Sequence, residues 1–368
     1  MVIGTGGTAG HVFPAVATAL RLRDRLGAEV VFVGRAEGQE AELVPAAGFP
    51  LVTVEAVPFR RALSMATLRA PFAALRAARE CRSVVRGATV VVGMGGYVSV
   101  PVSLAARRER IPLVLHEQNA LPGLANRLAA RWARLVALSF LEAGRRLPRR
   151  VRTVVTGTPV RDAILRVRQD RLALAEEGIR ELGLEPGRRT VTVFGGSQGA
   201  LRLNRAAVDL CGILADRPDL QIMLITGPRH HDLVRTHLPA TRKLLVRSAP
   251  FVDRMELVYA VADLAIARAG ATTVAELTAC GVPAILVPYP YATGRHQEAN
   301  ARAVERAGGA TVLLDDAATG GALAQRIEAF LEDPARLESM SRSSARFGRP
   351  DAADALADVA VSVIGDEG

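Results

Sequence analysis

The sequence predicts an α/β protein with two doubly wound domains, each built on a parallel sheet. Three observations predict this class. Short β-branched runs alternate with amphipathic helical stretches along most of the 368 residues, as in βαβ units with helices on both faces of a sheet. The alternation restarts near residue 190, and each series opens with a strand followed by a glycine-rich turn. A chain of this length also exceeds one ordinary domain.

The expected strands are short and rich in Val, Ile and Leu, as buried parallel strands are. The first series comprises residues 1–3, 30–33, 51–54, 90–92, 113–115, 135–137 and 153–155. The second series comprises residues 190–194, 221–225, 243–246, 264–267, 284–287 and 311–314. The stretches between them have the apolar spacing of helices that bury one face.

A hinge is expected between the two series, where TGTPVRDAI (156–164) interrupts the pattern with a Gly and a Pro. We therefore expect a first domain over residues 1–160 and a second over residues 161–344. A final helical stretch at about 345–365 follows, with the break GRP at 348–350. We expect this last helix to pack back on the first domain.

The composition limits the classes of partner. A net charge of +10 favours polyanions such as nucleic acid, anionic lipid or a diphosphate ligand. One Trp and four Tyr are too few for stacking platforms, so we expect no nucleic-acid partner. The three cysteines are far apart, which favours reduced structural thiols over a zinc site. The start lacks a basic segment, so we expect no signal peptide, and its abruptness suggests truncation or a frayed first strand.

The glycine turns are the main candidates for ligand binding. TGGTAG (5–10) and GGSQGA (195–200) would each open a helix whose N-terminal amides can meet an anion or a sugar. Packing alone is the alternative for any single glycine turn. A dinucleotide site is disfavoured because Gly34 and Arg35 stand where an acidic ribose ligand belongs, although Arg35 would suit NADP.

His11 follows the first turn directly, at the start of the expected helix. A neutral imidazole there could accept a proton near pH 7, which makes His11 a candidate general base. The alternative is that His11 caps or packs the turn.

Seven motifs together resemble the MurG family of transferases, and they span nearly the whole chain. They are GGTAGHVFPA (6–15), GMGGYVSVP (93–101), LHEQNALPGLANR (115–127), GTPVR (157–161), GGSQGALRLN (195–204), RAGATTVAEL (268–277) and HQEANA (296–301). The resemblance implies the GT-B glycosyltransferase fold, with two Rossmann-like domains facing across a cleft. It also implies transfer of N-acetylglucosamine from UDP-N-acetylglucosamine to undecaprenyl-diphospho-N-acetylmuramoyl-pentapeptide, with no cofactor and a role in cell-wall synthesis, cell shape and division.

The resemblance assigns the donor to the second domain and the lipid-linked acceptor to the first. The donor residues it implies are Arg161, Ser197, Gln198, Gly199, Phe251, Val252, Gly270, Ala271, Thr272, Thr273, Glu276, Gln297 and Asn300. The acceptor-side residues are Thr8, Ala9, Gly10 and Asn119, with His116 and Glu117 as candidates for positioning the base or the hydroxyl.

Five of these donor residues also have a structural alternative. Glu276 would hold the ribose hydroxyls, but Thr273-x-x-Glu276 also reads as a capping box. Phe251 would cover uracil, but an aromatic residue at a strand end is usually core. Gln297 and Asn300 could be ordinary exposed amides, and Arg161 a solvated linker residue.

The absence of an Asp-x-Asp pair from the sequence favours a metal-independent mechanism. We expect helix N-termini and backbone amides to stabilise the departing UDP while His11 deprotonates the acceptor hydroxyl. The resemblance implies inversion at the anomeric carbon.

The segment 59–86 combines apolar residues with many arginines, which suits a surface that lies on anionic lipid. An amphipathic helix packed on the sheet is the alternative. We expect a peripheral protein at the cytoplasmic face of the cell membrane, with cell-wall assembly proteins as further candidate partners. The rival functions are another GT-B enzyme, such as a lipid glycosyltransferase or a UDP-sugar epimerase, and a basic nucleic-acid-binding protein.

Overall fold

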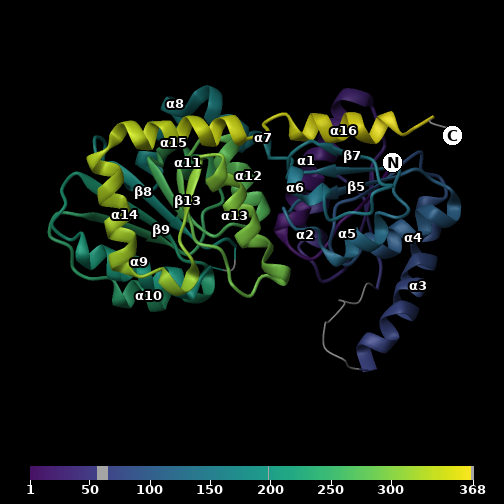
Figure 1. Ribbon diagram of the computed structural model, residues 1–368, viewed down its shortest axis with the longest axis horizontal. Helices are drawn as coiled ribbons and strands as arrows, with labels where there is room; N and C mark the ends of the chain where they lie inside the picture. The colour runs from purple at the N-terminus through teal and green to yellow at the C-terminus, as the bar shows by residue number, and fades with distance from the viewer. Residues whose placement is uncertain (56–64, 198, 366–368) are drawn as a thin grey trace. The chain divides into compact units, whose positions relative to one another are not determined.

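The computed structural model describes residues 1–55, 65–197 and 199–365, and the chain divides into two units. The first unit is Met1–Arg161 together with Pro350–Gly368, and the second is Asp162–Arg349. Each unit is a parallel sheet with helices on both faces (Figure 1). The predicted α/β class, with two doubly wound sheets, is confirmed.

The first unit contains a seven-stranded parallel sheet in the order β3-β2-β1-β4-β5-β6-β7. Its strands are β1 (Val2–Gly4), β2 (Val31–Gly34), β3 (Leu51–Thr53), β4 (Val91–Gly93), β5 (Leu113–Glu117), β6 (Leu135–Leu138) and β7 (Thr153–Val155). Its helices are α1 (Ala9–Leu26), α2 (Glu40–Ala46), α3 (Met65–Val85), α4 (Ser99–Glu109), α5 (Leu124–Ala129), α6 (Leu141–Gly144) and α16 (Ala352–Ser362).

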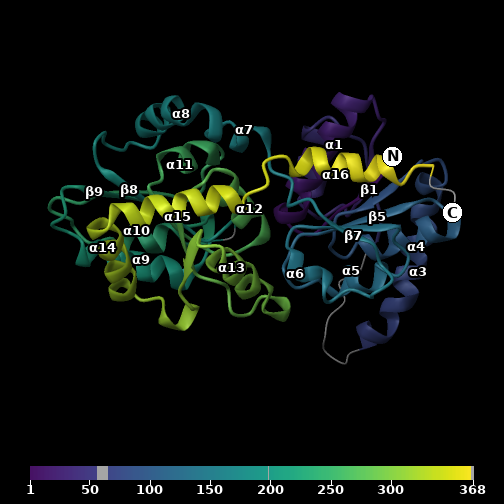
Figure 2. The same ribbon diagram turned by 45° about the horizontal axis from the view of Figure 1, so that its top comes forward.

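The second unit contains a six-stranded parallel sheet in the order β10-β9-β8-β11-β12-β13. Its strands are β8 (Arg189–Phe194), β9 (Leu220–Ile225), β10 (Leu245–Ala249), β11 (Leu264–Ala267), β12 (Ala284–Leu286) and β13 (Ala310–Val312). Its α-helices are α7 (Asp162–Leu165), α8 (Val167–Glu181), α9 (Leu201–Ile213), α10 (His231–His237), α11 (Met255–Val261), α12 (Ala271–Ala279), α13 (His296–Arg306), α14 (Gly320–Glu332) and α15 (Pro334–Phe347). Helices α8 and α11 lie on one face of this sheet, and α9 and α10 lie on the other (Figures 1 and 2).

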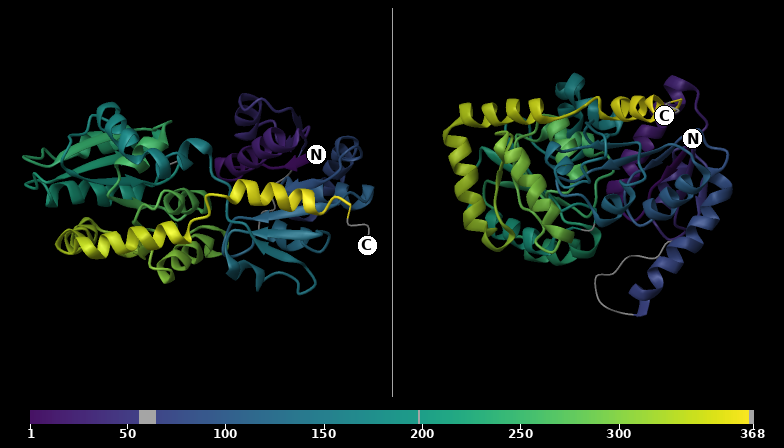
Figure 3. Two further views of the ribbon diagram at one scale, coloured as in Figure 1. Left: turned by 90° about the horizontal axis from the view of Figure 1, so that it is seen from above. Right: turned by 45° about the vertical axis from the view of Figure 1, so that its right-hand side comes forward.

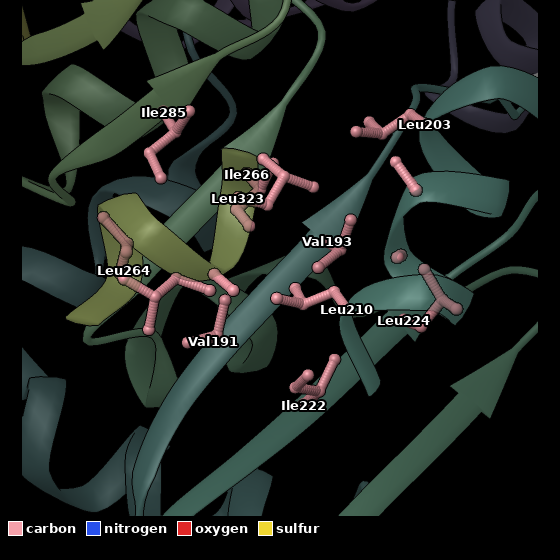
Figure 4. Packing of buried hydrophobic residues seen from close by; sticks show 14 of the residues in the cluster. Val191, Val193, Leu203, Leu210, Ile222, Leu224, Leu264, Ile266, Ile285 and Leu323 are labelled. Atoms are coloured by element: carbon pink, nitrogen blue, oxygen red, sulfur yellow. The ribbon is translucent and has the colours of Figure 1, made fainter. Parts of the chain in front are cut away.

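All thirteen expected strands are present in the described residues, with bounds that shift by a few residues. They form because their runs of branched apolar residues can be covered on both faces. In the second unit, Val191 and Val193 of β8 and Ile266 of β11 pack with Leu203 and Leu210 of α9 (Figure 4). This buried layer holds the carboxyl ends of β8 and β11 in place.

The last helix, α16, lies alongside α1 (Figures 1 and 3). Leu356 of α16 is fully buried in the same cluster as Leu22 of α1. Asp354 also pairs with Arg21 at 3.2 Å and with Arg25 at 2.7 Å. Residues 345–349 lie in or directly after α15, so the first-unit part of the chain's end begins at Pro350.

Candidate functional site

Both sheets reverse their strand order at a single place, and the glycine motifs follow the strands that meet there. In the first unit β1 pairs with β4, with Gly4 opposite Gly93. In the second unit β8 pairs with β11, with Phe194 opposite Ala267. Ligands of open α/β sheets bind beyond the carboxyl ends of the strands at such a switch point. Each unit therefore has its own candidate binding site, built from two loops.

The two loops of the first unit are in close contact at glycines. Gly96 has φ +77, and a Cβ there would lie 2.3 Å from the carbonyl oxygen of Gly6. Only glycine fits such a backbone conformation and such a close approach. The turn after β1 and the turn after β4 therefore form one continuous surface.

His11 lies on this surface, in the first turn of α1. Its Nδ1 is 3.3 Å from Thr8 Oγ1. A Cβ on Gly95 would lie 3.3 Å from His11 Nε2, so the absence of a side chain at Gly95 leaves room beside that nitrogen. Asn126 is close by, with its Nδ2 3.9 Å from the same Cβ position. The ring of His11 is placed between the two loops.

Glu40 lies directly behind the first turn, and the sequence analysis missed it. It is fully buried at the start of α2, and its carboxylate accepts hydrogen bonds from the amides of Gly7 at 3.3 Å and Arg35 at 2.9 Å. Gln39 accepts a hydrogen bond from the amide of Ala9. Two of the turn's amides are therefore engaged by the chain's own side chains. The sequence does place an acidic residue shortly after the second strand, where its carboxylate can accept hydrogen bonds from the glycine turn, and this position could have indicated Glu40.

His116 is fully buried on β5, so it does not lie open to a substrate. Its Nε2–H donates to the carbonyl oxygen of Gly157 at 2.8 Å, which leaves Nδ1 as the unprotonated nitrogen. Burial is the main cause that lowers the pKa of His116 to about 4; the hydrogen bond to Gly157 opposes this shift, and the nearby His11 adds a smaller lowering. The imidazole is therefore neutral near pH 7, and its effect on a substrate would be indirect.

Glu117 organises the loop that follows β5. Its carboxylate accepts hydrogen bonds from the amides of Asn119 (2.9 Å) and Gly123 (3.1 Å), and from the side chain of Asn126 (2.9 Å). Burial raises the pKa of Glu117, and these hydrogen bonds oppose that rise. The carboxylate thus fixes the start of α5 and the position of Asn119.

Arg161 is the last residue of the first unit, and its guanidinium carbon lies 4.2 Å from the ring centre of Phe13 on α1. The alternative of a solvated linker arginine is therefore wrong. The contact is a cation–π pair, which restricts the orientation of the guanidinium.

In the second unit, the turn after β8 is packed against the loop after β9. A Cβ on Gly199 would lie 2.2 Å from the carbonyl oxygen of Thr226. Ser197 is exposed at the tip of the turn, ahead of the N-terminus of α9. Gln198 lies outside the described residues, so its predicted role has no structural counterpart here.

Helix α12 begins in the other loop of this switch point. Gly270 is its N-cap in an extended conformation, and Ala271, Thr272 and Thr273 form its first turn. The amides of a first turn have no partner within their own helix, so they can bind an anion. No side-chain cap is present, and Thr273 lies inside the helix, so the capping-box alternative for Thr273 and Glu276 is wrong.

Glu276 projects from α12 and is 6% exposed. The hydroxyl of Tyr259, on α11, donates a hydrogen bond to its Oε2 at 2.8 Å. The protein therefore holds one oxygen of this buried carboxylate.

Two further buried contacts fix the loop that leads into α12. Arg268 forms an ion pair with Asp315 at 2.6 Å and donates to the carbonyl oxygen of Val287 at 3.1 Å. Asn300 is fully buried, and its amide donates to the carbonyl oxygen of Ala269 at 3.2 Å. Asn300 is thus not an exposed amide. In this structure it holds the loop instead of lying open to a sugar.

The remaining predicted donor residues lie nearer the surface. Phe251 is 50% exposed, so it is not a core residue, and Val252 is half-buried beside it. Gln297, on α13, accepts a hydrogen bond from the amide of Tyr289 at 2.9 Å.

Residues 59–64 of the basic, apolar segment lie outside the described residues. Arg82 of α3 and Arg86, which directly follows that helix, both bond to Glu109 of α4. No helix in the described ranges is long and apolar enough to cross a membrane. The same ranges contain no group of three or more His, Cys, Asp or Glu side chains that could hold a metal ion.

Comparison with known proteins agrees with this arrangement. Family models described as the glycosyltransferase family 28 N-terminal and C-terminal domains match residues 1–138 and 190–356. The UDP-N-acetylglucosamine–N-acetylmuramyl-(pentapeptide) pyrophosphoryl-undecaprenol N-acetylglucosamine transferase of Halothermothrix orenii is 42% identical over 97% of this chain and 96% of its own. The enzyme of the same name from Acidothermus cellulolyticus is also 42% identical, over 98% of this chain and 96% of its own.

Solved structures show the same relationship. MurG of Acinetobacter baumannii superimposes with a TM-score of 0.79 at 29% identity, covering 98% of this chain and 99% of its own. The UDP-GlcNAc 2-epimerase of Neisseria meningitidis, at 12% identity and a TM-score of 0.69 over 98% of both chains, shares the fold alone. The chain therefore belongs to glycosyltransferase family 28 and, within it, to the MurG family.

Proposed function

We propose that this chain transfers N-acetylglucosamine from UDP-N-acetylglucosamine to the C4 hydroxyl of undecaprenyl-diphospho-N-acetylmuramoyl-pentapeptide, a step of peptidoglycan synthesis. The observation that carries the proposal is the 42% identity, over 97% of the chain, to a transferase whose name states this donor and this acceptor. The two glycine-lined switch points support it, because a nucleotide sugar and a lipid diphosphate both present phosphate oxygens to backbone amides.

The donor site is assigned to the second unit. The first turn of α12 and the turn after β8 begin from paired strands, so their amides can converge on one diphosphate. Glu276 would accept the ribose hydroxyls. Phe251, half-exposed, would cover the uracil next to the backbone of Val252. Gln297 would contact the sugar, whereas Asn300 would act through the loop it holds.

The departing UDP carries a growing negative charge, which the helix N-termini of α9 and α12 would stabilise without a metal ion. The reaction would proceed with inversion, because the acceptor hydroxyl attacks the anomeric carbon from the side opposite the leaving diphosphate. The guanidinium of Arg161, whose orientation Phe13 restricts, would bring a positive charge to the negatively charged nucleotide.

His11 would be the general base. If its Nδ1–H donates to Thr8 Oγ1, then Nε2 is the unprotonated nitrogen, and because Gly95 has no side chain, no Cβ crowds that nitrogen. His11→Ala should lower kcat by about 100-fold or more with little change in donor affinity. A loss of less than about tenfold would exclude base catalysis by His11.

The rest of the acceptor site would consist of Thr8, Ala9, Gly10 and Asn119. Because Gln39 occupies the amide of Ala9, a ligand that uses this amide has to displace the exposed Gln39 side chain. Glu40 would stay in place and keep the turn in shape.

The segment 59–86 would hold the first unit against anionic lipid at the cytoplasmic face of the membrane, where cell-wall assembly proteins would meet it. Glu109 engages Arg82 and Arg86, and Glu55 and Glu80 engage Arg76, so the remaining arginines of the segment would contact the headgroups. Flotation with liposomes should depend on anionic lipid; equal flotation with neutral liposomes would contradict this.

A UDP-sugar epimerase is the second candidate, because such an enzyme shares the fold. The test is UDP release from UDP-N-acetylglucosamine with and without the lipid-linked muramoyl acceptor. Release that requires the acceptor supports transfer. Conversion of the nucleotide sugar without any acceptor would support the epimerase.

A further inference from the structure

Arginines follow the strands β8 to β12 at the carboxyl edge of the sheet in the second unit, each in the connection after its strand or at the start of the next helix. The chain's own carboxylates engage four of them: Arg202 pairs with Asp315 at 3.7 Å, Arg254 with Glu177 at 2.7 Å, Arg268 with Asp315 at 2.6 Å and Arg295 with Glu298 at 3.0 Å. The arginine after β9 is Arg229, which is exposed and forms no ion pair with any residue that the structure describes. Among these guanidinium groups, that of Arg229 therefore keeps its charge for a ligand.

The connection that carries Arg229 is held against the glycine turn after β8. Strands β8 and β9 are neighbours in the sheet, and α9 and α10 follow them on the same face (Figures 1 and 2). Arg229 is the middle residue of a 3₁₀ helix (Pro228–His230), three residues after the buried Thr226. A Cβ on Gly199 would lie 2.2 Å from the carbonyl oxygen of Thr226, and the side chain of Asn204 donates to the same oxygen at 2.8 Å. The backbone that leads to Arg229 therefore lies beside the turn GGSQGA.

A guanidinium suits a diphosphate for reasons of charge and shape. It stays protonated near neutral pH, and its planar fork of N–H donors can bind two phosphate oxygens at once. Its side chain has several rotatable bonds, so an exposed arginine can reach a ligand that the neighbouring turn holds. Backbone amides and helix N-termini contribute only partial charges, to which a guanidinium adds a full one.

We propose that Arg229 binds the diphosphate of the UDP-sugar and stabilises UDP as it leaves. The inference rests on the proposed function, because that function places the diphosphate at the turn after β8 and at the start of α12. In the transfer step, the bond between the anomeric carbon and the β-phosphate oxygen breaks, and its electron pair stays on that oxygen. The oxygen of the acceptor hydroxyl forms the new bond to the carbon and gives its proton to the base. The diphosphate gains negative charge, so the guanidinium stabilises the transition state more than the bound donor.

Arg229→Met removes the charge and keeps a long side chain, and because the site is exposed the variant should fold like the wild type. Isothermal titration calorimetry measures the binding of UDP and, by competition, of uridine. Arg229→Met should bind UDP about tenfold more weakly and uridine less than about twofold more weakly, since uridine has no phosphate. Arg235→Met is the matched control, because Arg235 is exposed on α10 and its loss changes the net charge equally. This control should bind both ligands within about twofold of the wild type.

Kinetics and salt dependence supply further readouts. Arg229→Met should also lower kcat at saturating donor by about tenfold, because the guanidinium acts more strongly in the transition state. Arg229→Lys keeps the charge without the fork, so it should recover most of this rate and bind UDP about threefold more weakly than the wild type. The difference in UDP affinity between the wild type and Arg229→Met should shrink as salt is raised, because exposed charges are screened.

Unchanged UDP affinity and unchanged kcat in Arg229→Met would overturn the inference. Equal weakening of UDP and uridine would overturn it too, because it would indicate a change in the shape of the site. A loss in Arg235→Met as large as in Arg229→Met would show that the charge of the whole unit acts, and not this residue. Weaker UDP binding with an unchanged kcat would overturn the part that concerns the leaving group. A wild-type protein that does not bind UDP would instead contradict the proposed function itself.

Discussion

Gly96→Ala perturbs the contact between the two glycine turns of the first unit most directly. The backbone of Gly96 has φ +77, and a Cβ at this position would lie 2.3 Å from the carbonyl oxygen of Gly6. Gly27→Ala is a matched control. Gly27 also has positive φ, at +60, but a Cβ there would meet nothing within 4 Å.

The expected cost can be estimated from these two observations. An alanine in the left-handed region costs about 1–2 kcal/mol at either position. The Cβ–oxygen distance at Gly96 is also roughly 1 Å shorter than an ordinary carbon–oxygen contact, so the two turns have to move apart. Forcing extra atoms into a tightly packed region typically costs about 1–3 kcal/mol more. Gly96→Ala should therefore destabilise by about 3 kcal/mol, against about 1 kcal/mol for Gly27→Ala.

Urea unfolding followed by the fluorescence of Trp132 measures this difference, because the chain has one Trp and it lies in the first unit. Transfer activity should fall more than about tenfold in Gly96→Ala, since the position of His11 depends on both turns, and should stay near wild type in Gly27→Ala. Equal loss of stability in the two variants would refute the close packing of the turns.

Other buried groups give further predictions. His116 has a pKa of about 4 in the folded protein and about 6.5 when unfolded, so the unfolded chain binds more protons below pH 6.5. The free energy of unfolding should therefore fall by about 2 kcal/mol between pH 7 and pH 5. Urea unfolding of His116→Gln should not show this part of the loss. Glu40→Ala leaves the amide of Gly7 without its acceptor and should lower the free energy of unfolding by about 2–3 kcal/mol; a change below about 0.5 kcal/mol would contradict the anchoring role. Asn300→Ala releases the carbonyl of Ala269 and should weaken UDP and UDP-N-acetylglucosamine binding equally, whereas a loss confined to the sugar nucleotide would indicate direct contact.

The fold was predictable because parallel strands covered on both faces have a strong signature. The strand segments that contain Val191 and Ile266 are almost entirely buried, and a glycine turn follows β8 immediately. The order of the strands follows from such βαβ units, and with it the position of each switch point. His11 could be placed at the first switch point for the same reason.

The supporting contacts of the site could not be predicted from local sequence. Glu40 and Tyr259 each act on a segment far along the chain, Gly7 and Glu276, through hydrogen bonds that only the folded structure creates. Sequence spacing also allowed a capping box at Thr273 as an alternative, but the helix begins earlier, at Ala271, with Gly270 as its N-cap. The burial of Asn300 and its hydrogen bond to the carbonyl of Ala269 are likewise visible only in the folded structure.

The most direct test of the proposed metal-independent transfer is an assay with labelled UDP-N-acetylglucosamine and the lipid-linked muramoyl-pentapeptide, with and without excess chelator. Because backbone amides and helix N-termini would stabilise the leaving UDP, labelled disaccharide lipid should form at the same rate in both conditions. Loss of transfer on chelation, restored by a divalent cation, would contradict this mechanism.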